Sequence, residues 1–427
     1  MAVPTQESYL VVGGGTSCGE NIVEQLLRRG ETRVTIFEAQ PLATEQAQRF
    51  GPAVRTYVGD ILDPESILDA VKSCAATCVI HSGMVSTTLA LAARYPTGLK
   101  GLPSLADVKE KYPQQLEYHR KVNTDGTRNV LAAALGTTVT QLVYVGNADI
   151  VFDGRDRPML REDEAQYPAK CLNAEVESQS HAERMVLSFN GLNELRTAVI
   201  RPSMLFGPSL GNTFILRRIQ ACPSLAGFQV GEKSNLVDRT HVANVAHAAI
   251  LAADRLTPAH PQHVATAGRA FFITNDEPRP FWDFMREVWV ATGGAPPPPH
   301  VAGKGTMMFI AGGKRCGRRF EGRLAREVLG YAPIVSYDEG VRRIAEWWLE
   351  LQLKICKEKG STTDGVVPPP WKYGMTNTFF SNDDERLRFI LRVGGTGILY
   401  ISPRERNRHD IICVSGDYTQ KCQRRPI

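Results

Sequence analysis

The chain has 427 residues, of which 43% are hydrophobic and 22% are charged. This composition is typical of globular proteins and excludes the disordered, collagen-like and membrane-spanning classes. The formal net charge is +5, but the excess lies at the C-terminus, where residues 356–427 hold 12 Lys and Arg against 8 Asp and Glu. Because the main body is nearly neutral, we expect no nucleic-acid partner.

Nine cysteines are spread along the chain without a C-x-x-C pair or a Cys/His ligand cluster. We therefore expect reduced thiols and no metal site. Residues 1–8 lack the layout of a secretory signal, and no apolar run reaches the roughly 18 residues of a membrane span. These features predict a cytoplasmic protein without a membrane span, with peripheral attachment to an intracellular membrane as the alternative.

The N-terminal part predicts a βαβ unit. An apolar run at 9–12 ends in three glycines at 13–15, and an amphipathic pattern follows up to Gly30, a typical C-cap. A second apolar run at 34–37 ends at Glu38, 25 residues after Gly13. A strand, a glycine turn, a helix and an acid at the tip of the second strand are typical of a dinucleotide site.

Further strand-like runs at 55–58, 78–81, 141–145 and 197–200 alternate with helical segments such as 124–135 and 182–187. This alternation predicts an α/β fold with a doubly wound parallel sheet, the Rossmann architecture. The length leaves room for a smaller C-terminal substrate lobe. We expect the NAD-binding domain at 1–202 plus 241–267, the substrate lobe at 203–240 plus 268–355, and a poorly ordered tail of unknown role at 356–427 with one strand-like piece at 397–401.

The glycine turn carries the cofactor prediction. Backbone N–H groups of such a turn, with the N-terminus of the next helix, can approach a pyrophosphate. Glu38 would accept hydrogen bonds from a ribose diol and repel a 2'-phosphate, which favours NAD over NADP. The alternatives are a tight turn that binds nothing and a surface glutamate.

Five segments occur in the order found in an extended short-chain dehydrogenase, and the chain resembles that family over about residues 8–350. They are VVGGGTSCG at 11–19, GDI at 59–61, VNTDGT at 122–127, RPS with FGP within 201–208, and DRTHVANV at 238–245. The last segment, with 271–281 and 325–332 after it, is most similar to the 3β-hydroxysteroid dehydrogenase and sterol-4α-carboxylate 3-dehydrogenase branch.

The resemblance implies that Gly13, Gly14 and Gly19 hold the pyrophosphate of NAD. Thr16 stands where the middle glycine of the family belongs, and its Cβ would crowd the phosphate unless Gly15 provides an alternative register. The other implied contacts are Glu38 with the adenosine ribose, Asp60 and Ile61 with the adenine, Ser82 and Gly83 along the cofactor, and Pro202 near the nicotinamide.

The catalytic positions depart from the family pattern. Similar proteins use a Tyr, whose pKa near 10 is lowered by a Lys four residues later, and a Ser or Thr that binds the substrate oxygen. In this chain the hydroxyl position holds Asn147, and an ungapped alignment of 167–183 places Glu175 at the Tyr position and Gln179 at the Lys position. Loss of proton transfer costs about 10²- to 10⁴-fold, so we do not expect alcohol dehydrogenation by the usual route.

Glu175 is our candidate acid–base group and Asn147 the polar residue that orients the substrate. Asp149 follows the same strand end and either faces the pocket or lies in a turn. The carboxyl ends of the strands are where such sites form. For four further residues we expect no catalytic role. His81 is expected in the core, His181 on the surface, and Tyr167 and Lys170 in a loop rather than as a displaced catalytic pair.

Three functions remain open. The first is an enzyme that acts on a steroid- or terpenoid-like molecule by a non-redox reaction such as isomerisation, elimination or cyclisation. The second is an unusual NAD-dependent oxidoreductase of sterol or secondary metabolism, and the third is an inactive dinucleotide-binding pseudoenzyme. The expected partner is an apolar small molecule, which the leucine-rich stretch 86–118 would cover as a lid unless it packs on the body. A homodimer is an open alternative to a monomer.

Overall fold

The computed structural model describes residues 4–84, 117–153, 159–208, 228–230, 235–294, 300–302, 318–358, 389–393, 397–401 and 411–415. At 228–230, 300–302, 355–358 and beyond 388, only the backbone is described. The lid expected at 86–118 lies outside the described residues except for its last two positions, and most of the tail at 356–427 lies outside them as well.

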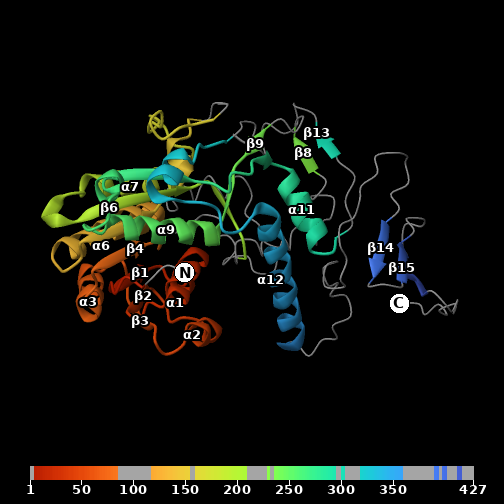
Figure 1. Ribbon diagram of the computed structural model, residues 1–427, viewed down its shortest axis with the longest axis horizontal. Coiled ribbons are helices and arrows are strands. Elements are labelled where there is room, and N and C mark those ends of the chain that lie inside the picture. Colours follow the sequence, from red (N-terminus) through yellow and green to blue (C-terminus); the bar gives the residue numbers. More distant parts are fainter. Residues whose placement is uncertain are drawn as a thin grey trace. The chain divides into compact units, whose positions relative to one another are not determined.

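Seven strands form the main sheet, all parallel and in the order β3-β2-β1-β4-β5-β6-β11 (Figure 1). The order reverses at the boundary of β1 and β4, the place where doubly wound proteins bind ligands. The Rossmann prediction is therefore confirmed. The strands are β1 (Tyr9–Val12), β2 (Val34–Glu38), β3 (Arg55–Val58), β4 (Cys78–His81), β5 (Gln141–Val145), β6 (Arg196–Pro202) and β11 (Arg269–Ile273).

Helices cover both faces of this sheet because the strands bury side chains on both. In β1, Tyr9 and Val11 face the core formed with α1 (Ser17–Arg29) and α9 (Val242–Leu256). Leu10 and Val12 face the opposite core, which is formed with α3 (Pro64–Cys74), α6 (Gly126–Leu135) and α7 (Ala174–Ser188). The central strands β1, β4 and β5 are buried at every position, as expected when both faces of a sheet are covered, whereas the edge strand β3 is largely exposed.

Two helices are longer in the structure than the sequence pattern predicted. The helix expected at 124–135 begins with a π-helical turn, η1 (Arg120–Asp125), before α6. The helix expected at 182–187 is the second half of α7, which begins after Asn173. The Asn173 side chain accepts a hydrogen bond from the Val176 amide at 2.9 Å and caps the helix. The remaining described helical elements are α2 (Thr44–Phe50), η2 (Ala148–Val151), η3 (Leu192–Glu194), α10 (His263–Thr266), α11 (Asp283–Ala291), η5 (Ala325–Leu329) and α12 (Tyr337–Glu358).

Short strand pairs build the region beyond the main sheet. β7 (Met204–Phe206) pairs with β10 (Arg239–His241), β9 (Leu236–Val237) with β12 (Arg279–Pro280), and β8 (Phe228–Val230) with β13 (His300–Ala302). The division into a Rossmann domain and a substrate lobe stays a prediction. β11, which falls in the range expected for the lobe, is hydrogen-bonded to β6 in the main sheet.

By its contacts the chain forms two compact units, residues 1–289 with 296–344, and residues 290–295 with 345–427. The first unit contains the main sheet. In the second unit, β14 (Phe389–Val393), β15 (Gly397–Ile401) and β16 (Ile411–Ser415) form an antiparallel sheet. The strand expected at 397–401 is thus found as β15. None of the described helices combines the length and the apolar character of a membrane span.

Candidate functional site

The glycine loop after β1 requires glycine at its two ends. Gly13 has φ of +80°, and a Cβ at this position would lie 2.3 Å from the Cα of Gly83. A Cβ at Gly19 would lie 2.0 Å from the carbonyl oxygen of Gly13. The first glycine therefore turns the chain beneath Gly83, and the second lets α1 pack against the loop, as in dinucleotide-binding proteins.

Thr16 caps helix α1. Its hydroxyl donates to the Gly13 carbonyl at 2.8 Å and accepts from the Gly19 amide at 3.1 Å, so the side chain is turned back toward the loop. The amides of Gly14, Ser17 and Cys18 donate to no atom of the described residues. Three donors at a helix N-terminus suit a pyrophosphate.

Glu38 closes the loop from the tip of β2. Its carboxylate accepts from the Gly15 amide at 2.8 Å and from the Ala39 amide at 3.2 Å. Burial raises the pKa of Glu38, and the two hydrogen bonds oppose that shift. The carboxylate keeps further acceptor capacity for a ribose diol. Loop and carboxylate together fit NAD.

The other expected cofactor contacts lie at two places. Ser82 lies against the glycine loop, where its hydroxyl donates to the Val12 carbonyl at 3.2 Å. Pro202 ends β6 at the same edge of the sheet. Asp60 is exposed and accepts from the Leu62 amide at 2.9 Å, while Ile61 next to it packs near Gly126. Their contacts with a cofactor stay predictions.

Two histidines lie where the sequence predicted, one in the core and one on the surface. His81 is fully buried, contacts the Thr127 hydroxyl at 3.0 Å through Nε2, and accepts from the Gly83 amide through Nδ1 at 3.3 Å. Burial lowers the pKa of His81 to about 4, so its ring is neutral at physiological pH. His181 is exposed on α7.

Tyr167 and Lys170 do not form a catalytic pair. The Tyr167 hydroxyl donates to a carboxylate oxygen of Glu183 at 2.6 Å, whereas Lys170 is exposed. Tyr144, at the end of β5, donates its hydroxyl to the sulfur of Met84. Among the tyrosines and lysines that the structure describes near these strand ends, none are paired as the usual mechanism requires.

Two of the three expected catalytic positions are joined through their side chains. Asn147 follows β5, and its Nδ2 donates to the Oε1 of Gln179 on α7 at 3.0 Å. The Oδ1 of Asn147 accepts from the Asp149 amide at 2.9 Å, which starts the short helix η2. The NH₂ group of Gln179 donates to no described residue. This leaves the NH₂ group of Gln179 available for a ligand near the end of β5.

Glu175 and Asp149 supply two carboxylates beside these amides. Glu175 is half-buried and lies one helical turn before Gln179. Asp149 accepts from the Nη1 of Arg318 at 2.7 Å. Burial raises the pKa of Asp149; Arg318 opposes this rise, and the charge of Glu175 adds to it. An acid–base group beside amide donors can move a proton at a bound carbonyl compound.

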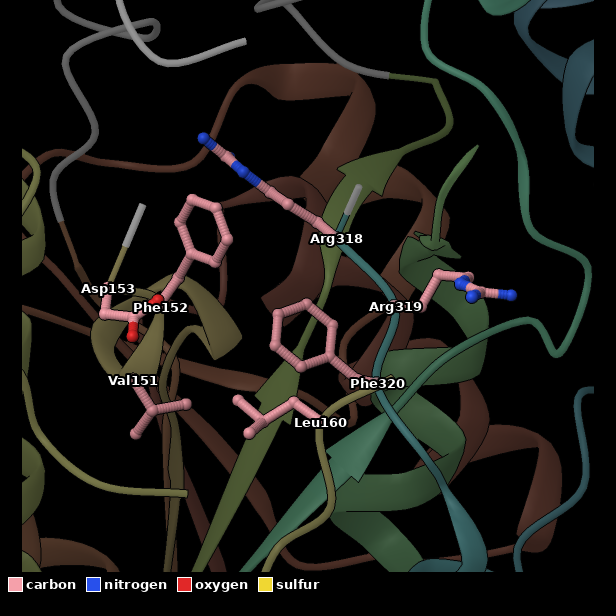
Figure 2. A pocket seen from close by; sticks show the side chains of 7 residues that line it. All are labelled: Val151, Phe152, Asp153, Leu160, Arg318, Arg319 and Phe320. Carbon is pink, nitrogen blue, oxygen red and sulfur yellow. The ribbon is translucent and has the colours of Figure 1, made fainter. Parts of the chain in front are cut away.

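A small pocket opens beside η2. Figure 2 shows Val151, Phe152, Leu160 and Phe320 converging on it, with the guanidinium of Arg318 next to Phe152. The carbon of that guanidinium lies 4.7 Å from the Phe152 ring centre. The pocket and the Asp149 carboxylate therefore share one cation.

Two ion pairs of this region were not predicted from the sequence. Arg318 lies 169 residues from Asp149 and belongs to no periodic pattern. A second ion pair joins Glu183 of α7 to Arg201 of β6, with side chains 0% and 7% exposed. An acidic residue on a helix and an arginine ending an apolar strand are weak signals by themselves.

Comparisons with known proteins identify the family of this chain. The chain matches the 3-beta hydroxysteroid dehydrogenase/isomerase family over residues 102–300. It is 30% identical over 370 residues to the decarboxylating sterol-4-alpha-carboxylate 3-dehydrogenase of Schizosaccharomyces pombe, covering 80% of this chain and 97% of that protein. The mouse enzyme of that name is 32% identical, covering 68% of this chain and 70% of that protein.

The chain belongs to the 3-beta hydroxysteroid dehydrogenase/isomerase family. That Asn147, Glu175 and Gln179 stand at the family's Ser, Tyr and Lys positions stays a prediction from the sequence. Solved structures show a likeness of fold at lower sequence identity. They include the epimerase Mth375 of Methanothermobacter thermautotrophicus, with a TM-score of 0.62, 18% identity and coverage of 83% of this chain and 95% of that one. Another is the enzyme WbmH of Bordetella bronchiseptica in complex with NAD+, with a TM-score of 0.58, 16% identity and coverage of 81% and 99%.

Proposed function

We propose that this protein is an NAD-binding enzyme that acts on a sterol or related terpenoid-like molecule by proton transfer without net oxidation. The observation that carries the proposal is the pair of amides, Asn147 and Gln179, joined at 3.0 Å where the family has a hydroxyl residue and a lysine. The relatives named as sterol-4-alpha-carboxylate 3-dehydrogenases support the sterol class. The family description, which includes isomerases, supports the reaction class.

Glu175 is the acid–base group of the proposed reaction. As a carboxylate it removes a proton from a carbon next to a substrate carbonyl and returns it to another carbon of the conjugated system. Atoms and electrons balance, because the double bond moves and no oxidant is consumed. Elimination would use the same carboxylate to take the proton and then to give it to the leaving hydroxyl, which departs as water. Proton transfer of this kind contributes about 10²- to 10⁴-fold.

The amides have the second role. Negative charge develops on the carbonyl oxygen when the adjacent proton leaves, and N–H donors aimed at that oxygen stabilise it. The NH₂ group of Gln179 is not hydrogen-bonded to any described residue, and Asn147 uses one of its two N–H bonds for Gln179. Neither amide carries charge, so the pair holds a substrate oxygen without taking up or releasing a proton.

NAD would lie along the glycine loop. Gly13, Gly14 and Gly19 with the N-terminus of α1 would hold its pyrophosphate, and Glu38 its adenosine ribose. When bound, the nicotinamide supplies a hydride acceptor. The residues of this chain shape the cleft beside it and handle the proton at Glu175.

A second candidate is NAD-dependent oxidation of a sterol hydroxyl, with Glu175 taking the hydroxyl proton. The kept glycine cradle and the dehydrogenase names of the relatives favour it. The two candidates differ in whether reduced cofactor accumulates with product.

The test compares Glu175→Gln with Glu177→Gln, a change at an exposed position on the same helix. Full-length protein with NAD is supplied with a panel of 3-hydroxy- and 3-keto-sterols and terpenoids, and products are identified by mass spectrometry and NMR. We expect Glu175→Gln to lower kcat/KM by about 10²-fold or more, with NAD affinity unchanged. Undiminished turnover would refute the role of Glu175. Wild-type protein that binds NAD and converts nothing would instead indicate the pseudoenzyme.

A further inference from the structure

His81 lies at the carboxyl end of β4, beside the point where the strand order of the main sheet reverses. Two residues later, the backbone of Gly83 lies directly against the glycine loop. A Cβ at Gly13 would lie 2.3 Å from the Cα of Gly83 and 2.6 Å from its nitrogen. Because doubly wound sheets bind their ligands at this reversal, Gly83 belongs to the β4 side of the proposed cofactor site.

The hydrogen bonds of the His81 ring select one tautomer. The Thr127 hydroxyl donates to the Asn123 carbonyl at 2.6 Å, so its oxygen is left to accept from Nε2 of His81 at 3.0 Å. On the other side of the ring, Nδ1 of His81 accepts from the Gly83 amide at 3.3 Å, and an amide N–H can only donate. Both contacts therefore require the proton on Nε2 and the lone pair on Nδ1.

These bonds continue to the helix that carries Gln179. Asn123 lies in the π-helical turn η1, and its Nδ2 donates to the hydroxyl of Ser178 on α7 at 3.0 Å. The side chains of His81, Thr127, Asn123 and Ser178 are buried, none of them more than 2% exposed. Water does not reach such a chain to replace a lost partner, so each bond fixes the group that makes the next one.

We propose that His81 is a positioning residue of the NAD site, which fixes the Gly83 amide through Nδ1 and so holds the backbone of Gly83 against the glycine loop in the conformation that binds the cofactor. This inference rests on the NAD binding of the proposed function. Glycine loses more conformational freedom on ordering than any other residue. Without the bond to His81, that ordering would take place when NAD binds, and binding would be weaker.

The test uses the different reach of two amide side chains. In His81→Asn, Oδ1 lies as far from the backbone as Nδ1 of the ring and can accept from the Gly83 amide. In His81→Gln, Nε2 replaces Nε2 of the ring and donates toward Thr127, so the bond to Gly83 is lost. In titration calorimetry with NAD, we expect His81→Asn to bind within about threefold of wild type and His81→Gln to bind about tenfold more weakly.

Urea unfolding of the same two variants separates positioning from stability. A merely structural role of His81 would lower the unfolding midpoint and the NAD affinity of both variants alike. Equal NAD affinities of His81→Asn and His81→Gln would therefore overturn the inference. If wild-type protein does not bind NAD, the proposed function fails and the inference fails with it, whereas equal affinities of the two variants refute the inference alone.

Thr127 supplies a second set of variants that leave His81 and Gly83 in place. Thr127→Val removes the acceptor of Nε2, so the proton can move to Nδ1, where it would face the Gly83 amide hydrogen. We expect Thr127→Val to weaken NAD binding about tenfold and Thr127→Ser, which keeps the hydroxyl, to bind within about threefold of wild type. Ring ¹⁵N NMR, with the signals assigned through His81→Asn, should place the proton of wild-type His81 on Nε2. A proton on Nδ1 in wild-type protein would overturn the inference.

Discussion

Glu183→Gln should destabilise the first unit strongly, although Glu183 lies outside the proposed chemistry. Arg201 donates through Nε to both carboxylate oxygens of Glu183, at 3.0 and 3.1 Å, and its Nη2 adds a further bond. The Tyr167 hydroxyl donates to the same carboxylate. The substitution keeps the shape of the side chain but leaves the guanidinium buried without a counterion.

The burial of both partners sets the magnitude. Exposed ion pairs contribute about 0 to 1 kcal/mol, whereas removal of one partner from a buried pair costs about 3 to 5 kcal/mol. The side chains of Glu183 and Arg201 are 0% and 7% exposed, so the second class applies. The amide of Gln still accepts one hydrogen bond, which favours the lower end, about 3 kcal/mol.

Urea unfolding followed by circular dichroism measures the change. With an m-value of about 3 kcal/mol/M, the midpoint should fall by about 1 M. Glu177→Gln, exposed on the same helix, should change stability by no more than about 0.5 kcal/mol. Glu183→Leu combined with Arg201→Met should recover most of the loss, because no charge then stays buried. Equal midpoints for Glu183→Gln and Glu177→Gln would refute the reasoning.

Two further predictions concern cofactor binding and pH. Gly19→Ala should abolish NAD binding in titration calorimetry, because the added Cβ would lie 2.0 Å from the Gly13 carbonyl oxygen. The control is Gly136→Ala, whose Cβ would meet only the Ala132 carbonyl oxygen, at 3.6 Å, and this variant should bind NAD normally. Burial raises the pKa of Asp238 from 3.8 to about 6, so its contribution to stability is present below pH 4 and is lost as the pH rises to about 6. Asp238→Asn can still accept the hydrogen bond from the Phe320 amide, so this variant should gain stability relative to wild type as the pH rises from 4 to 6. Urea unfolding midpoints of both proteins are measured at pH 4 and at pH 6. An equal difference between the two proteins at both pH values would contradict this prediction.

Apolar runs predicted most of the main sheet because its central strands, such as β1, β4 and β5, are continuous buried segments. The strands β1 to β6 lie at or within a few residues of the expected runs. The pairs of β7 with β10 and β9 with β12 were not predicted, since strands of two or three residues are too short for a periodic pattern.

Only those residues of the candidate site that follow from a single ungapped alignment could be predicted from the sequence. Asn147 and Gln179, placed from the register of β5 and α7, are hydrogen-bonded in the structure. Arg318 was not predictable, because its position depends on the path of 318–321 between Leu160 and the segment 236–238. That path is a tertiary property, and no local pattern in the sequence encodes it.

The central claim is that the proposed site moves protons without net oxidation. Its most direct test is the amount of reduced nicotinamide formed for each molecule of product, followed by absorbance during turnover of the sterol and terpenoid panel by wild-type protein. The account predicts product without accumulation of reduced cofactor. One reduced cofactor for each product would contradict it and establish oxidation of the substrate instead.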